Sequence, residues 1–239
     1  MTSKTSLAVA LAAAAAFSLV ATAPARAEWA IDLFGGVSWT KSTDVDVTGR
    51  DNNGLSTQVT ISDVEVDPGF TAGARVGYWL ESLPFLGLGV DAFFFSLPVP
   101  AQTVAANGTF SASVDGKPIT FTPSGDANLP ELTLPGVAFS PQLMLRLPLF
   151  VSDDAPKGRL QPYLGGGPAW AFTIESDELA LILGGLFRAG VALQVFRFLA
   201  LFAEYRYTFF PGFEVKDEGL TFKTDLNSHH VVAGLSFRF

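Results

Sequence analysis

The chain ends in the sequence HHVVAGLSFRF, residues 229–239, and the character of these residues changes with a period of two. Successive side chains of a β-strand point to opposite faces, so the alternation predicts a strand with one face in lipid and the other toward a polar interior. Polar or small residues occupy most of the inner parity. The outer parity holds His229, Val231, Ala233, Leu235, Phe237 and Phe239.

The N-terminus has the features of a secretion signal. Lys4 precedes an uncharged, alanine-rich stretch over residues 7–23, and Ala25 and Ala27 match the small-x-small pattern of a signal-peptidase site. We therefore expect residues 1–27 to be a cleaved signal peptide and residues 28–239 to be one exported domain.

Composition narrows the class of protein further. Loss of Lys4 and Arg26 from the 15 basic residues leaves 13 against 23 acidic ones, a formal charge of −10, which argues against nucleic acid as a partner. The chain has no cysteine, so packing and hydrogen bonds alone must hold the fold. Hydrophobic residues make up 49% of the chain, yet no long apolar run follows Ala27, and this favours short membrane-crossing strands over helices.

Alternating segments recur along the mature chain, separated by connections that are mostly longer at one end of the strands than at the other. This rhythm predicts an all-β fold, an eight-stranded antiparallel up-and-down transmembrane β-barrel with long extracellular loops and short periplasmic turns, in a Gram-negative-type outer membrane. Aromatic residues near strand ends fit the headgroup girdles of such barrels. The eight segments are 28–39, 69–80, 84–97, 136–149, 159–173, 183–195, 197–210 and 228–239.

The mature chain resembles a known family. The segments Gln161–Pro168 (QPYLGGGP) and Phe202–Tyr207 (FAEYRY), with the terminal Phe239, look like the small outer-membrane β-barrel family related to the OmpA transmembrane domain and the opacity-type surface proteins. The resemblance covers nearly all of residues 28–239 and implies the barrel fold. It is weak for function, since family members include adhesins and structural anchors.

The inward parity carries an unusual set of charged and amide side chains. An eight-stranded barrel is only wide enough for side chains to fill it, so we expect these groups to pair with one another as a structural plug. The alternative is a narrow, porin-like cationic path for protons or small anions, or a carrier of small hydrophobic molecules. The predicted polar network is Asp32, Arg75, Asp91, Gln142, Arg146, Arg188, Gln194, Glu204, Arg206, His230 and Arg238.

Two histidine-containing patterns raise the question of catalysis or metal binding. Ser228 and His230 share one face of a strand, and Asp225 or Glu204 would complete a hydrolytic set of the kind used by lipid A esterases. That family has His-x-Ser on the lipid-facing surface, whereas this chain has Ser-x-His facing inward. His229 and His230 point to opposite faces and cannot chelate one ion. We expect no enzyme activity, no cofactor and no metal site.

Glycines 165–167 resemble a phosphate-binding loop only in composition, because they lie within a strand and lack the following Lys-Ser/Thr. We expect them to permit sheet coiling or to make room for a large side chain. In loop 40–66 the carboxylates of Asp44, Asp46, Asp51, Asp63 and Glu65 lack the order of a dedicated calcium site, so they serve solvation or divalent bridging to lipopolysaccharide.

The two long loops, 40–68 and 98–135, are the expected sites of a structural or surface-interaction role through an extracellular ligand. Residues 109–121 predict a hairpin that turns on Asp115-Gly116-Lys117-Pro118. Phe237 and Phe239 resemble the signal read by the barrel-assembly machinery. Outer-membrane lipid, lipopolysaccharide, that machinery and periplasmic chaperones are the other expected partners.

Overall fold

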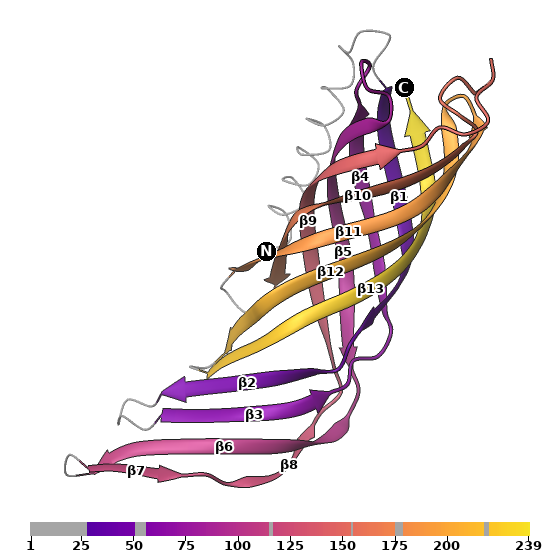
Figure 1. Ribbon diagram of the computed structural model, residues 1–239. Coiled ribbons are helices and arrows are strands. Elements are labelled where there is room, and N and C mark those ends of the chain that lie inside the picture. The colour runs from indigo at the N-terminus through magenta and orange to yellow at the C-terminus, as the bar shows by residue number, and fades with distance from the viewer. Residues whose placement is uncertain (1–27, 51–55, 115–116, 154, 175–178, 218–219) are drawn as a thin grey trace, which may run out of the picture.

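The computed structural model describes residues 28–50, 56–114, 117–153, 155–174, 179–217 and 220–239, and the predicted signal peptide lies outside them. In these ranges all strands join one antiparallel sheet (Figure 1). The strands are β1 (Glu28–Thr40), β2 (Thr43–Arg50), β3 (Ser56–Val64), β4 (Gly69–Trp79), β5 (Leu86–Val99), β6 (Gln102–Val114), β7 (Lys117–Phe121), β8 (Ser124–Leu129), β9 (Leu132–Arg146), β10 (Leu160–Ile174), β11 (Leu179–Phe196), β12 (Leu199–Asp217) and β13 (Leu220–Arg238).

Eight of these strands close into a ring in the order β1-β4-β5-β9-β10-β11-β12-β13. The ring closes where β1 pairs with β13 without interruption, from Ala30 opposite Arg238 to Thr40 opposite Ser228. Each ring strand overlaps one of the eight segments expected from alternation. The prediction of an eight-stranded antiparallel barrel is therefore confirmed.

The wall of the ring has an apolar outer face and a mixed inner face. Leu33, Leu143, Leu164 and Phe187 point outward and expose 50–59% of their surface, whereas inward neighbours such as Arg188 are buried. Burial of a charged residue beside an exposed leucine is the reverse of a water-soluble fold and suits a wall surrounded by acyl chains. Among the described residues, no helix is long and apolar enough to cross a bilayer.

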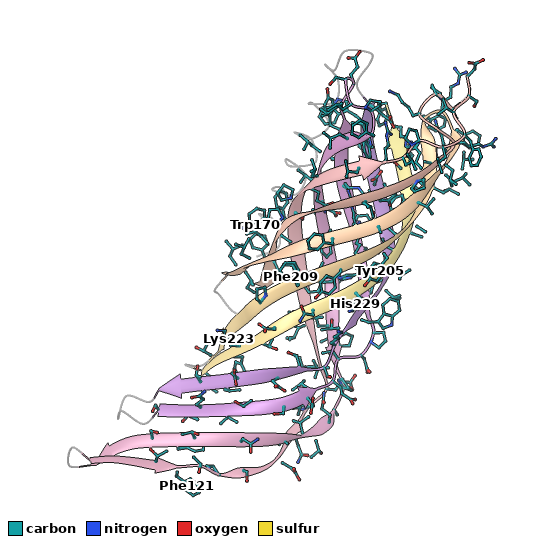
Figure 2. All side chains as sticks on the ribbon, viewed as in Figure 1. Phe121, Trp170, Tyr205, Phe209, Lys223 and His229 are labelled. Carbon is teal, nitrogen blue, oxygen red and sulfur yellow. The ribbon has the colours of Figure 1, made fainter. Side chains whose placement is uncertain are left out.

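Aromatic side chains gather on the outer face. At the end with short turns, Trp29 and Tyr78 lie with ring centroids 4.9 Å apart. Toward the other end, Trp170, Tyr205 and Phe209 project from the outside of the ring (Figure 2). Such belts at both ends fit the headgroup regions on the two sides of a membrane.

The pairing of β9 with β10 is interrupted midway. Pairs run from Tyr163 opposite Arg146 to Gly166 opposite Leu143 and resume at Trp170 opposite Phe139. The constant register places Pro141 opposite Pro168 in the gap, and neither proline has an N–H to donate. The Ser140 hydroxyl donates instead to the Pro168 carbonyl oxygen at 2.7 Å, which provides one link across the gap.

The long connections contain strands that the sequence analysis assigned to loops. The strands β2, β3, β6, β7 and β8, together the extracellular platform, continue the sheet beyond the ring through the pairing of β13 with β2 (Figure 1). They lie at the end with long connections, which faces outward in barrels of this type. The expected hairpin is confirmed by β6 and β7, which pair from Phe110 opposite Phe121 to Val114 opposite Lys117. Asp115 and Gly116 lie outside the described residues, and Lys117 and Pro118 belong to β7 rather than to the turn.

Candidate functional site: the lumen and the extracellular platform

Glu204 on β12 lies at the centre of the lumen among four partners. Its Oε2 accepts hydrogen bonds from the Tyr163 hydroxyl at 2.7 Å and from Arg75 Nη1 at 3.0 Å, and it lies 3.5 Å from Arg188 Nη1. Its Oε1 accepts from Arg206 Nε. Glu204 thus neutralises charge from two other strands, β4 and β11, and from Arg206 on its own strand.

Asp91 and Asp32 complete this central cluster. Asp91 lies 3.3 Å from Arg206 Nη2 and 3.7 Å from Arg188 Nη1, and Asp32 accepts from Arg75 Nε at 2.6 Å. The Arg206 guanidinium also lies 3.7 Å from the centre of the Phe34 ring, a cation–π contact in a desolvated site. Three arginines face three carboxylates, so the cluster is formally neutral.

A second charged layer lies nearer the periplasmic end. Arg146 makes two hydrogen bonds to Glu28, Nη1 to Oε1 at 3.0 Å and Nη2 to Oε2 at 2.6 Å, and its guanidinium stacks 4.2 Å from the Trp79 ring. Arg238 donates to the Gln161 side-chain oxygen at 2.8 Å and lies 3.5 Å from Glu28. A cavity of about 30 Å³ separates the two layers, space for about one or two water molecules.

The extracellular half of the lumen holds an apolar cluster beside buried hydroxyl side chains and His230. Phe93, Phe95 and Leu97 of β5 meet Leu186, Phe210, Leu226 and Val232 from the opposite wall, all of them buried. Leu186 is fully buried, which shows how closely the side chains fill the section. Two charged layers and an apolar layer therefore follow one another along the barrel axis.

All of the side chains predicted for the polar network are buried on the inner side of the ring. Those of the two charged layers pair as described, and the Gln194 side chain donates to the Arg197 carbonyl oxygen at 3.2 Å. Glu28, Gln161 and Tyr163 were missed. Glu28 lies four residues before Asp32 on β1, so its side chain points to the same inner face. Following the alternation back to the start of the strand would have found it. The predicted network has five arginines and three carboxylates, and Glu28 adds a fourth carboxylate to it.

Ser228 and His230 do not form a catalytic pair. The Ser228 hydroxyl lies 2.7 Å from the Thr40 hydroxyl, and His230 Nε2 lies 3.0 Å from the Thr208 hydroxyl. Asp225 accepts from the backbone N–H of Gly212 at 2.7 Å. Each group has a separate structural partner, so the serine has no base in contact with it.

The two adjacent histidines lie on opposite sides of the wall. His229 is on the outer face (Figure 2), where its Nδ1 lies 2.6 Å from the Tyr205 hydroxyl, and His230 is in the lumen. Within the part of the chain that the structure describes, no three His, Cys, Asp or Glu side chains are grouped to hold a metal ion.

The glycines at 165–167 allow close approach inside the barrel. A Cβ on Gly165 would lie 2.7 Å from Arg188 Nε, and a Cβ on Gly167 would lie 2.0 Å from the Pro141 carbonyl oxygen. Gly165 therefore makes room for a large charged neighbour, and Gly167 lets β10 approach β9 at the proline gap.

The platform has one polar face, to which the acidic loop residues contribute. The Asp46 carboxylate accepts from the Thr60 hydroxyl at 2.6 Å, and Asp44 accepts from the Asp63 backbone N–H at 3.0 Å. A hollow of about 320 Å³ lies beside β6, at the point where its pairing with β7 ends and its pairing with β8 begins. Uncharged side chains line it, including Gln58, Thr60, Asn107, Thr109, Thr122 and Ser124.

No protein-family model matches the chain, and no curated protein is significantly similar in sequence. Solved structures of small outer-membrane β-barrel proteins do match it in shape. The chain forms a transmembrane β-barrel of the outer-membrane type. Neisserial surface protein A is 14% identical, with 88% of this chain and 97% of that chain covered and a TM-score of 0.44. OprG from Pseudomonas aeruginosa is 11% identical, with 89% of this chain and 95% of that chain covered and a TM-score of 0.46. The attachment invasion locus protein Ail of Yersinia pestis is 12% identical, with 90% of this chain and 99% of that chain covered and a TM-score of 0.29. All three TM-scores lie below 0.5, so the barrel assignment rests on the closed ring of eight strands and its apolar outer face.

Proposed function

We propose that the protein is a cell-surface scaffold, in which the barrel anchors the chain in the outer membrane and the extracellular platform makes the interactions. The observation that carries the proposal is the platform itself. It continues the barrel sheet through the pairs Phe222–Val47 and Val47–Val59. Rigid elements that project from a stable scaffold are common binding surfaces.

The contents of the lumen favour an anchor over a channel. Ion pairs between Arg75, Arg206, Asp91 and Glu204 cross the section from several strands, and an apolar layer lies above them. A conducting path would have to break several buried, charge-assisted hydrogen bonds, each worth more than a neutral one. We therefore expect no steady conductance in planar-bilayer recordings.

Insertion and surface contacts complete the proposal. Export by the signal peptide delivers the chain to periplasmic chaperones and to the barrel-assembly machinery, which would recognise Phe237 and Phe239 at the end of β13. Carboxylates at the base of the platform, among them Asp44 and Asp46, would bind lipopolysaccharide phosphates through divalent cations. The separate structural partners of Ser228 and His230 support a non-enzymatic role.

Cysteine labelling on intact cells tests the placement of the platform, because the chain has no native cysteine. Gln58→Cys, on the polar face of β3, should react with a membrane-impermeant maleimide. Ser236→Cys, buried in the lumen, is the matched control and should react only after denaturation. Absence of labelling at position 58 in a correctly inserted protein would refute the surface assignment.

A further inference from the structure

A groove of about 560 Å³ crosses the outer face of the barrel wall near its periplasmic end. Residues that stand opposite each other in an antiparallel pair share a face, so the registers show how the groove is built. Two adjacent rows of outward-facing residues line it. The first row leads from β1 across β4, β5 and β9 to β10 and consists of Trp29, Tyr78, Leu88, Leu143 and Gly166. The second row includes Val76, Val90 and Pro141.

Small residues hollow the wall along these rows. Gly166 contributes no side chain to the outer face of β10, and the ring of Pro141 on β9 is short beside it. Within the described chain, no charged residue lines the groove. The side chain of Gln142 is buried toward the lumen, where its Nε2 donates to Asp91 at 3.3 Å. The groove therefore suits a hydrocarbon chain, which has no polar group to leave unpaired.

The groove starts at the periplasmic edge of the wall and rises from there. Four strand spacings of about 4.8 Å give the first row a length of about 19 Å. Because strands of such barrels tilt by about 35–45°, a row perpendicular to them climbs about 11–13 Å along the membrane normal. Trp29 is the second residue of β1 and Gly166 the seventh of β10, and this difference corresponds to a climb of about 12–14 Å at the same tilt. The groove thus ends inside one leaflet, whose hydrocarbon is about 15 Å thick.

The two ends of the groove lie at different depths. Trp29 and Tyr78, with ring centroids 4.9 Å apart, mark the level of the headgroups, because aromatic belts lie at the membrane interface. The upper end, at Pro141 and Pro168, lies within the hydrocarbon, where the ladder between β9 and β10 is interrupted. A groove with one end among headgroups and the other among acyl chains matches the polarity of a membrane lipid.

We propose that the groove binds one phospholipid of the periplasmic leaflet, with an acyl chain along the two rows and its glycerol and headgroup beside Trp29 and Tyr78. Neighbouring same-facing residues of a strand are about 7 Å apart, so a groove of two rows admits an acyl chain and is too narrow for a helix about 10 Å wide. A lipid of the opposite leaflet would not reach the interfacial end. This site is separate from the extracellular platform and goes beyond the proposed scaffold function.

Native mass spectrometry of the folded barrel counts the lipid that remains bound. The protein would be refolded into vesicles that contain dipalmitoyl phosphatidylethanolamine and lipopolysaccharide, and then extracted into a mild detergent. The unmodified chain should retain one phosphatidylethanolamine. Val90→Trp fills the second row and should lower the retained fraction about tenfold, the effect of lost contact with about two methylene groups. Gel mobility selects the folded species in each case.

Val191→Trp is the matched control. Val191, on the outer face of β11, has nearly the same exposed fraction as Val90, 40% against 42%, and lies outside the groove. This variant should retain the lipid as the unmodified chain does. The proposal would be overturned by an unmodified chain without bound lipid, by an equal loss in both variants, or by retention of lipopolysaccharide in place of the phospholipid. Surface labelling of Gln58→Cys does not depend on any of these results.

A photoreactive lipid locates the acyl chain without any substitution in the protein. Phosphatidylethanolamine with a diazirine near the end of one acyl chain should label peptides of β9 and β10 around Pro141 and Pro168. A lipid that merely surrounds the barrel would label the outer faces of all the ring strands. Such even labelling would refute a bound position in the groove, whatever the amount of lipid retained in detergent.

Discussion

Replacement of Glu204 by glutamine tests whether the central cluster stabilises the barrel. The change keeps the volume of the side chain and removes the charge that faces Arg75, Arg188 and Arg206. Three buried guanidiniums would then share only Asp32 and Asp91. Removal of one partner from a buried ion pair costs about 3–5 kcal/mol, because the remaining charge is left without compensation.

This cost converts into a measurable shift in melting temperature. For a domain of this size, each kcal/mol lowers the Tm by about 2–4 °C, so Glu204→Gln should lower it by about 6–20 °C. The protein would be refolded into lipid vesicles and heated, with tryptophan fluorescence and gel mobility as readouts. Glu131→Gln, at an exposed carboxylate between β8 and β9, is the control and should leave the Tm unchanged.

A second variant makes the charge argument specific. Arg188 has the most distant nearest carboxylate of the three arginines, at 3.5 Å, and its Nε and Nη1 have no hydrogen-bond partner among the described residues. Glu204→Gln combined with Arg188→Gln restores neutrality and should recover about half of the lost Tm or more, since contacting residues are not additive. A loss of stability below about 1 kcal/mol in the single variant would refute the reasoning, because ordinary surface substitutions and exposed ion pairs have effects of that size. A double variant less stable than the single one would refute it as well.

Three further predictions concern packing, assembly and chemistry. Gly167→Ala should destabilise the barrel by about 1–3 kcal/mol in urea unfolding, because its Cβ would meet a backbone oxygen; Gly125→Ala, which meets nothing within 4 Å, should cost less than about 0.5 kcal/mol, and equal effects would contradict the packing argument. Deletion of Phe239 should reduce the amount of folded protein in the outer membrane on heat-modifiability gels, and normal levels would remove its role as an assembly signal. Ser228→Ala should leave the lipid A species of the cell identical by mass spectrometry, and a changed species would revive an enzymatic role.

The ring strands were predictable because outward apolar residues alternate with inward polar or small residues along them. In residues 183–195, outward Phe187 and Val191 alternate with inward Arg188 and Gln194, and the structure has this arrangement. A strand in a membrane wall has no other way to satisfy lipid on one side and a narrow interior on the other. The fold therefore followed from local pattern alone.

The apolar layer of the lumen and the platform were harder to predict. The run Phe93-Phe94-Phe95 is apolar on both parities, so it does not reveal that Phe93 and Phe95 fill the interior while Phe94 faces lipid. In the platform strands the apolar residues alternate with threonine, serine, asparagine or aspartate, and the sequence analysis assigned these segments to the two long loops. Their pairing depends on a partner distant in sequence, as where Phe222 of β13 meets Val47 of β2. Such contacts cannot be derived from a local period.

The facing prolines of β9 and β10 bear on how the cylinder would come apart. The junction of the first and last strands is paired at every position from Ala30 to Thr40, so the covalent ends of the wall meet at one of its most continuous joints. The joint with missing ladder bonds lies on the opposite side, around Pro141 and Pro168. Mechanical or thermal rupture should therefore start in the middle of the sequence, and the amides beside these prolines should be the first in the wall to exchange with deuterium.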